Sequence, residues 1–125
     1  MIEEKGIGWR LAIDHSKKKF PVVIGGECIS VQLSLVEWAS LAKLIFDLRE
    51  KFQEYTNNFS SDEAFILESE RDSWWSCFEG ANDSWSLKIR FAGDGLGERG
   101  FEMYWPIPSA QDFVSAMRIM WDSYQ

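Results

Sequence analysis

Residues 34–47 read SLVEWASLAKLIFD, and residues 109–122 read SAQDFVSAMRIMWD. Aligned without a gap, the two segments share a serine at the first and seventh positions and an aspartate at the last. Apolar residues recur at helical spacing in both, so each segment predicts an amphipathic helix. The two starts are 75 residues apart in a chain of 125, which predicts two related units that each end in such a helix.

The first residues of both segments are typical of helix starts. Ser34 and Glu37 have the spacing of a capping box, in which each side chain bonds the backbone N–H of the other residue. We expect this helix to run to about Tyr55. Ser109 takes the same position in the second segment, so we expect it to cap a helix that covers residues 109–123.

Short segments with period-two alternation precede each helix and predict β-strands. Gly25 and Gly26 form a two-residue hairpin signal between two of them. Hairpin-length connections make neighbouring strands antiparallel. The expected strands are 8–14, 20–24 and 28–33 in the first unit, and 63–69, 73–79, 85–91 and 101–105 in the second. The sequence therefore predicts an α+β fold of order βββα–ββββα, in one domain of two units, about 1–56 and 62–125.

Composition narrows the class of protein. The N-terminus lacks the apolar core of a signal peptide, and no apolar run is long enough to predict a membrane span. Cys28 and Cys77 fall within expected strands, so we interpret them as reduced packing residues of a cytoplasmic protein.

The net charge of −7 lies entirely in residues 61–125, because residues 1–60 hold eight basic and eight acidic residues. Phosphate backbones are repelled by such an acidic surface.

No segment predicts a catalytic, metal or cofactor site. Residues 95–100 match G-x-G-x-x-G, but the dinucleotide-binding motif needs a helix to follow and here a strand is expected, which favours a hairpin loop. His15 is the only histidine, beside Asp14 and Ser16, and adjacent residues cannot face one another as a catalytic triad requires. One histidine and two distant cysteines have no recognised metal-ligand spacing. We therefore expect a protein that is not an enzyme and has no cofactor.

Two groups of residues are candidates for binding single-stranded nucleic acid. Lys17, Lys18 and Lys19 form a basic turn. Lys88 and Arg90 lie on the polar face of an expected strand, next to a strand that holds Trp74 and Trp75. Basic residues with exposed aromatic rings suit single strands, because bases stack on the rings while cations follow the backbone.

A protein-interaction or assembly module is the alternative. The chain has seven tryptophans and nine phenylalanines, and exposed aromatic rings are enriched in interface hot spots. Such a surface would bind a protein partner or a second copy of the chain, without nucleic acid. The sequence leaves both hypotheses open.

Four segments also carry a resemblance to a known family. The run KKKFPVVIGGE (17–27), the S-x-x-E-W helix start (34–38), SWSLKIRF (84–91) and RGFEMYWP (99–106) resemble a cyanobacterial family of small uncharacterised proteins. The fold of that family is similar to the single-stranded-DNA-binding regulator fold of the plant Whirly proteins and the PC4 coactivator. The resemblance implies two tandem strand-strand-strand-strand-helix units and a nucleic-acid role. It transfers no functional residue, because the Lys-Gly-Lys-Ala-Ala-Leu motif of Whirly strands is absent.

Overall fold

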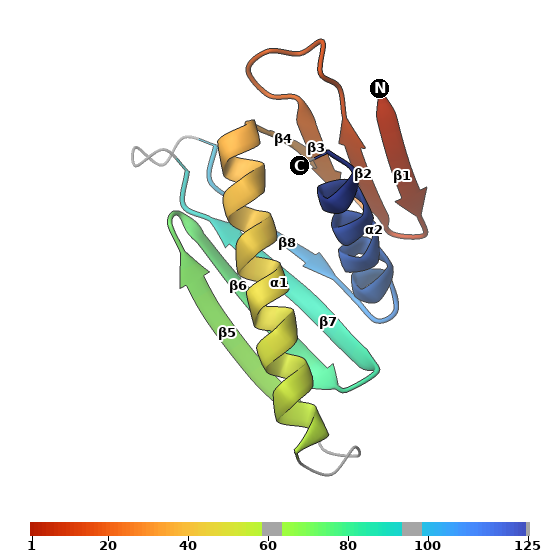
Figure 1. Ribbon diagram of the computed structural model, residues 1–125, viewed down its shortest axis with the longest axis vertical. Coiled ribbons are helices and arrows are strands. Elements are labelled where there is room, and N and C mark those ends of the chain that lie inside the picture. Colours follow the sequence, from red (N-terminus) through yellow and green to blue (C-terminus); the bar gives the residue numbers. More distant parts are fainter. Residues whose placement is uncertain (59–63, 94–98, 125) are drawn as a thin grey trace.

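Figure 1 shows the computed structural model of the chain, which describes residues 1–58, 64–93 and 99–124. Two four-stranded antiparallel meanders are each followed by a helix. The first sheet contains β1 (Ile2–Gly6), β2 (Trp9–Ile13), β3 (Val22–Gly25) and β4 (Ser30–Leu33), and α1 (Leu35–Asn57) follows. The second sheet contains β5 (Phe65–Arg71), β6 (Trp74–Ala81), β7 (Ser84–Phe91) and β8 (Phe101–Trp105), and α2 (Ser109–Tyr124) follows. The α+β class and the repeated layout are as predicted.

The order predicted for the first unit, βββα, is wrong because β1 was missed. Its residues pair with β2 in antiparallel register, with Ile2 opposite Ile13 and Gly6 opposite Trp9. All five residues are exposed, and three of them are charged. An edge strand of this kind shows no alternation of buried and exposed side chains, and its charges discourage pairing with another chain. The unit is therefore ββββα, like the second one.

The turn after β3 also differs from the prediction. Gly25 belongs to the strand and pairs with Ser30, so the loop covers the four residues 26–29 rather than Gly25-Gly26. Its ends are joined by a hydrogen bond of 2.9 Å from the Gly26 N–H to the Ile29 carbonyl. Cys28 is consequently exposed in a loop and is not a packing residue of a strand, whereas Cys77 lies in β6 and is half-buried.

The two helix starts are not equivalent. Ser34 accepts from the Glu37 N–H at 3.1 Å and its own N–H donates to the Glu37 carboxylate at 2.8 Å, which confirms the capping box. The predicted cap at Ser109 is wrong. Its hydroxyl donates to the Ile7 carbonyl at 2.8 Å, and the Asp112 N–H bonds the Pro108 carbonyl instead. Ser109 therefore joins α2 to the β1–β2 turn.

Each helix packs mainly against the sheet of the other unit. We expected each helix to cover a sheet; α1 packs against β5 and β6, whereas α2 packs against β1, β2 and β7 (Figure 1). One hydrophobic cluster includes side chains of both units. Two buried tryptophans of the second unit donate to backbone carbonyls of the first, Trp74 to Glu37 at 3.1 Å and Trp105 to Gly25 at 3.0 Å. The two units are therefore interlocked through their cores.

Candidate functional site

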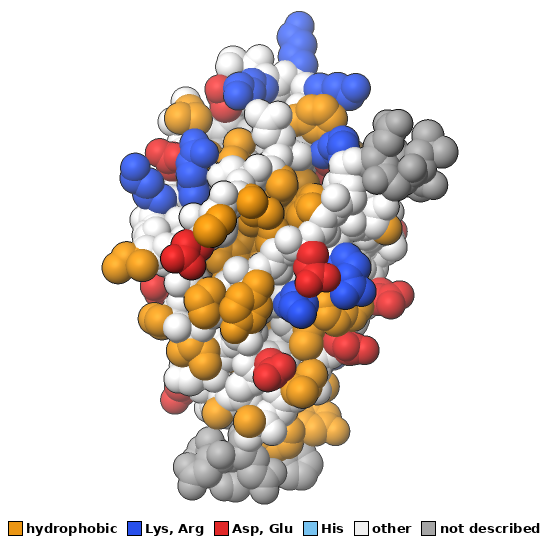
Figure 2. All heavy atoms as spheres, turned by 180° about the vertical axis from the view of Figure 1, so that it is seen from behind, with side chains coloured by type: hydrophobic (Ala, Val, Ile, Leu, Met, Phe, Trp, Pro, Cys, Tyr) orange, Lys and Arg blue, Asp and Glu red, His pale blue; other side chains and the backbone are white. Residues whose placement is uncertain are grey.

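The three lysines of the predicted basic turn lie between β2 and β3. Lys17, Lys18 and Lys19 are all exposed, and the Lys19 ammonium lies 5.4 Å from the centre of the Phe20 ring. Figure 2 shows the face turned away from the helices, where Lys and Arg side chains gather toward the end of the first sheet. The ammonium groups of this turn are therefore accessible to a polyanion.

The two basic residues of β7 are engaged by a carboxylate of the next strand. Arg90 lies opposite Glu102 in the register of β7 and β8, and its guanidinium forms an ion pair at 3.0 Å. The Lys88 ammonium lies 3.7 Å from the other oxygen of Glu102. Lys88 and Arg90 thus share one carboxylate and belong to a different sheet from the lysine turn. The candidate nucleic-acid residues do not form one basic surface.

The neighbouring tryptophans point to opposite faces of β6. Trp74 is 2% exposed and its ring centre lies 4.4 Å from that of Phe91, so it belongs to the core and cannot stack on a base. Trp75 is half-buried on the other face, where the Arg90 guanidinium lies 4.7 Å from its ring centre. Only Trp75 is placed at the surface with the basic pair.

We call the side of β5–β8 turned away from the helices the outer face of the second sheet. It carries four carboxylates and two basic groups, hence a net charge of −2, together with two exposed apolar side chains. The carboxylates are Glu68, Glu70, Glu79 and Glu102; the basic groups are Lys88 and Arg90; the exposed apolar residues are Ile66 and Tyr104. Figure 2 shows acidic side chains among apolar ones over this sheet.

The carboxylates of this face also affect the pKa of the Cys77 thiol. Burial raises its pKa, and the carboxylates of Glu68 and Glu79 raise it further, against the opposite effect of Lys88. A thiol with a raised pKa is protonated at neutral pH and is a weak nucleophile. Cys77 is therefore not an activated catalytic cysteine.

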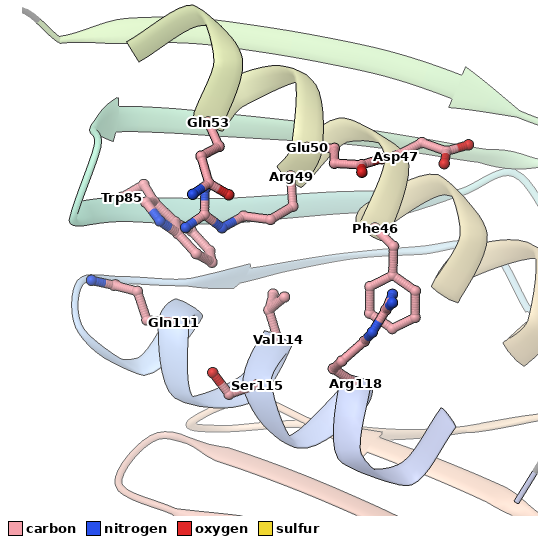
Figure 3. Close-up of a pocket in the computed structure, with 10 residues that line it drawn as sticks. All are labelled: Phe46, Asp47, Arg49, Glu50, Gln53, Trp85, Gln111, Val114, Ser115 and Arg118. Carbon is pink, nitrogen blue, oxygen red and sulfur yellow. The ribbon is translucent and has the colours of Figure 1, made fainter. Parts of the chain in front are cut away.

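A cleft of about 420 Å³ lies between α1 and α2, with Trp85 of β7 in its lining. We call it the interhelix cleft. Figure 3 shows side chains of α1 and α2 directed toward one another across it. Those of α1 are Phe46, Arg49 and Gln53, and those of α2 are Gln111, Val114, Ser115 and Arg118; Asp47 and Glu50 are exposed at its rim.

Two polar atoms in the lining of this cleft are buried without a hydrogen-bond partner. They are Nη1 of Arg49 and Oε1 of Gln111. The Gln111 amide is oriented by its other end, because its Nε2 donates to the Asp83 carbonyl at 2.6 Å. The Arg49 guanidinium lies 5.2 Å from the centre of the Trp85 ring. Such groups are rare in folded proteins, and a missing partner is one explanation.

The interhelix cleft was not among the sites predicted from the sequence. The spacing of Phe46, Arg49 and Gln53 places them on one face of α1, a signal that was available. No sequence signal indicated that this face of α1 would lie opposite α2, with Trp85 between them. That arrangement arises because each helix packs mainly on the sheet of the other unit, which we call the exchange of helices. Within 1–58, 64–93 and 99–124, no group of His, Cys, Asp and Glu could hold a metal ion. The glycine motif at 95–100 lies mostly outside the described residues.

Neither helix, over the residues that the structure describes, is long and apolar enough to cross a membrane. Residues 4–120 match the profile of DUF1818, a domain of unknown function. The fold is similar to that of a crystallised protein of unknown function from Prochlorococcus sp. NATL2A, described as a member of the DUF155 family. That structure is 35% identical, with a TM-score of 0.90 over 98% of this chain and 100% of that one. Among curated proteins, none matches this chain.

Proposed function

The chain belongs to the DUF1818 family, and we propose that it is a non-enzymatic protein-interaction module. In this proposal the outer face of the second sheet binds a basic segment of a partner protein. The observation that carries it is the pairing of Lys88 and Arg90 with Glu102, which leaves Glu68, Glu70 and Glu79 without a basic partner among the described residues.

The chemistry of this face supports a basic partner. Tyr104 is 53% exposed and Ile66 is 65% exposed, so apolar contacts are available beside the carboxylates. Opposite charges steer a partner to such a surface and exclude partners of the same sign. Self-association through this face would bring like charges together, so a second copy of the chain is disfavoured there. We assign the module to the cytoplasm, where the free thiols of Cys28 and Cys77 would stay reduced.

A single-stranded nucleic-acid-binding regulator is the second candidate. It is favoured by the exposed turn Lys17–Lys19 and by the tandem ββββα layout, which resembles that of the Whirly proteins. Fold alone does not assign function, and this turn would have to act against a net charge of −7. In this second proposal the lysines supply the phosphate contacts.

Two variants separate these functions. The face variant combines Trp75→Ser, Glu79→Lys and Tyr104→Ser; the loop variant replaces Lys17, Lys18 and Lys19 with Gln. A protein captured from an extract of the source organism is purified and titrated directly against the wild type and both variants. We expect a partner with a basic surface whose affinity falls with salt and is lost only in the face variant.

Labelled single-stranded oligonucleotides test the second candidate in the same buffers. A nucleic-acid role predicts binding at about 50 mM salt that weakens in the loop variant, with a salt slope reduced by up to about 2 at ~0.7 per phosphate contact. Such a result, with an intact response in the face variant, would replace the interaction module by the nucleic-acid module. A captured partner that binds both variants equally would reject the face.

A further inference from the structure

We propose that the interhelix cleft binds a small carboxylate that also carries a hydrogen-bond donor, such as a 2-hydroxy acid or a 2-amino acid. This site is separate from the outer face of the second sheet and does not depend on the function proposed for that face. It is built from α1, α2 and β7, and therefore from both units of the fold.

The donor that needs a partner belongs to Arg49. Its Nη1 is shielded from solvent and bonds no other group, so neither bulk water nor the protein satisfies it. A buried, unpaired donor on a charged group is unfavourable, and a carboxylate is the acceptor that a planar guanidinium binds best. Gln53 lies one helical turn after Arg49 and lines the same cleft, and we expect its side chain to turn when a carboxylate enters.

The acceptor that needs a partner belongs to Gln111. The bond from its Nε2 to the Asp83 carbonyl fixes which end of the amide is the oxygen, because a carbonyl accepts only from the nitrogen. The Oε1 atom is then an acceptor without a donor. A hydroxyl or ammonium group on the ligand supplies that donor. Both residues line the same cleft, so one ligand with both groups would satisfy both atoms once the side chains that cover them turn aside.

Charge and size further narrow the ligand. The charged side chains directed across the cleft are Arg49 and Arg118, and Arg118 already lies 3.6 Å from Asp122. Asp47 and Glu50 at the rim disfavour a dianion such as phosphate and favour a ligand with a single negative charge or an added ammonium. A cavity of about 420 Å³ is within the range of small-molecule sites.

The probes are lactate and L-alanine, with three controls of similar size. Propionate lacks the donor, methyl lactate lacks the carboxylate, and inorganic phosphate, in mildly alkaline buffer, is mainly a dianion. Binding is measured by calorimetry and by tryptophan fluorescence, since Trp85 lies in the cleft lining. We expect lactate or alanine to bind with a dissociation constant of about 1 mM or lower, and each control at least about tenfold more weakly.

Arg49→Gln should weaken binding of the preferred probe at least about tenfold, whereas Arg71→Gln, which removes one exposed positive charge at the end of β5, should leave it unchanged. Gln111→Met removes the acceptor and gives an independent variant if Arg49→Gln does not fold. The proposal is overturned if no carboxylate binds at about 10 mM, which is a weak affinity. It is equally overturned if phosphate or propionate binds as tightly as lactate and alanine, or if a folded Arg49→Gln or Gln111→Met protein binds like the wild type.

Discussion

Arg49 is a charged side chain that is partly buried in the interhelix cleft. Burial lowers the pKa of its guanidinium, and the nearby Asp83 carboxylate acts to raise it. The contact with the Trp85 ring returns some stabilisation, of the order of 0.5–1 kcal/mol. The unpaired Nη1 costs more than this, about 1–3 kcal/mol for a buried unsatisfied group. The side chain is therefore a poor choice for stability alone.

Replacing Arg49 with Met tests that balance. Methionine covers Trp85 with an apolar chain and removes the unpaired donor, so we expect the free energy of unfolding to stay within about 1 kcal/mol of the wild type or to rise. Chemical denaturation without added ligand measures it. A loss of more than about 2 kcal/mol in the free energy of unfolding would mean that Arg49 stabilises the fold despite its unpaired atom.

The adjacent tryptophans of β6 provide a second contrast between single residues. Trp74 packs against Phe91 and Phe101 and donates to the Glu37 carbonyl, so Trp74→Ala should cost about 3–5 kcal/mol. Trp75→Ala leaves the core intact and should cost about 1 kcal/mol or less. Denaturation midpoints of the two variants measure the difference. Equal losses would contradict the assignment of the two rings to opposite faces.

The starts of α1 and α2 differ in what their first serine bonds. Ser34→Ala removes the oxygen that accepts from the Glu37 N–H, so we expect a loss of about 1 kcal/mol. Ser109→Ala removes a bond to the carbonyl of the exposed Ile7, which water can replace, and should cost less. Urea denaturation of both variants measures this. A larger loss at Ser109 would contradict this order and would mean that its bond to the Ile7 carbonyl contributes more than the cap at Ser34.

Elements with strong local signals were predictable. The period-two alternation of β7 and the capping box of α1 are local, so both were found to within a few residues. β1 was missed because its pairing with β2, rather than its own exposed residues, keeps it extended. The interhelix cleft was not predicted because Arg49 and Gln111 come to line one cleft only through tertiary packing. Short-range patterns contain no information on such contacts.

Arg99 joins the two units of the molecule near the start of α1. Its guanidinium donates to the Glu37 carboxylate at 2.6 and 2.9 Å and to the Gln32 carbonyl at 2.8 Å. Partial burial acts to raise the pKa of Glu37, but the bonds from Arg99 and Ser34 outweigh it, and the net effect is a lowered pKa. A carboxyl of this kind stabilises the fold when it is ionised.

The stability that Glu37 contributes should therefore depend on pH. Because its folded pKa lies below the unfolded value, the contribution is complete above the unfolded pKa, about 4.3, and is lost as pH falls through the folded pKa. The stability difference between wild type and Glu37→Gln should be constant from about pH 7 to 5.5 and shrink below about pH 4. Glu54→Gln, at an exposed position of α1, is the control. A difference that grows on acidification would contradict the lowered pKa.

Because each helix packs mainly on the sheet of the other unit, neither unit contains a complete core of its own. Because α1 packs on β5 and β6, a fragment of residues 1–58 lacks the sheet that covers the apolar side of its helix. A fragment of residues 64–125 lacks β1 and β2, on which α2 packs, and the Gly25 carbonyl that the buried Trp105 indole bonds. Neither fragment can form the shared core alone. To fold alone, each fragment would have to pack its helix on the sheet of the same unit instead.

We therefore expect each fragment alone to unfold without a cooperative transition, and an equimolar mixture to regain one together with the near-ultraviolet circular dichroism of packed tryptophans. In the mixture, Trp105→Phe in the second fragment should weaken association, because the Gly25 carbonyl then loses its buried donor at a cost of about 1–3 kcal/mol. Trp75→Phe in the same fragment is the matched control, since that ring lies on the outer face and its contact is with Arg90 of its own unit. If residues 1–58 unfold cooperatively on their own, the units are separate folding domains and the exchanged helices do not determine stability. If both substitutions weaken association equally, the bond to Gly25 does not distinguish the interface from the outer face.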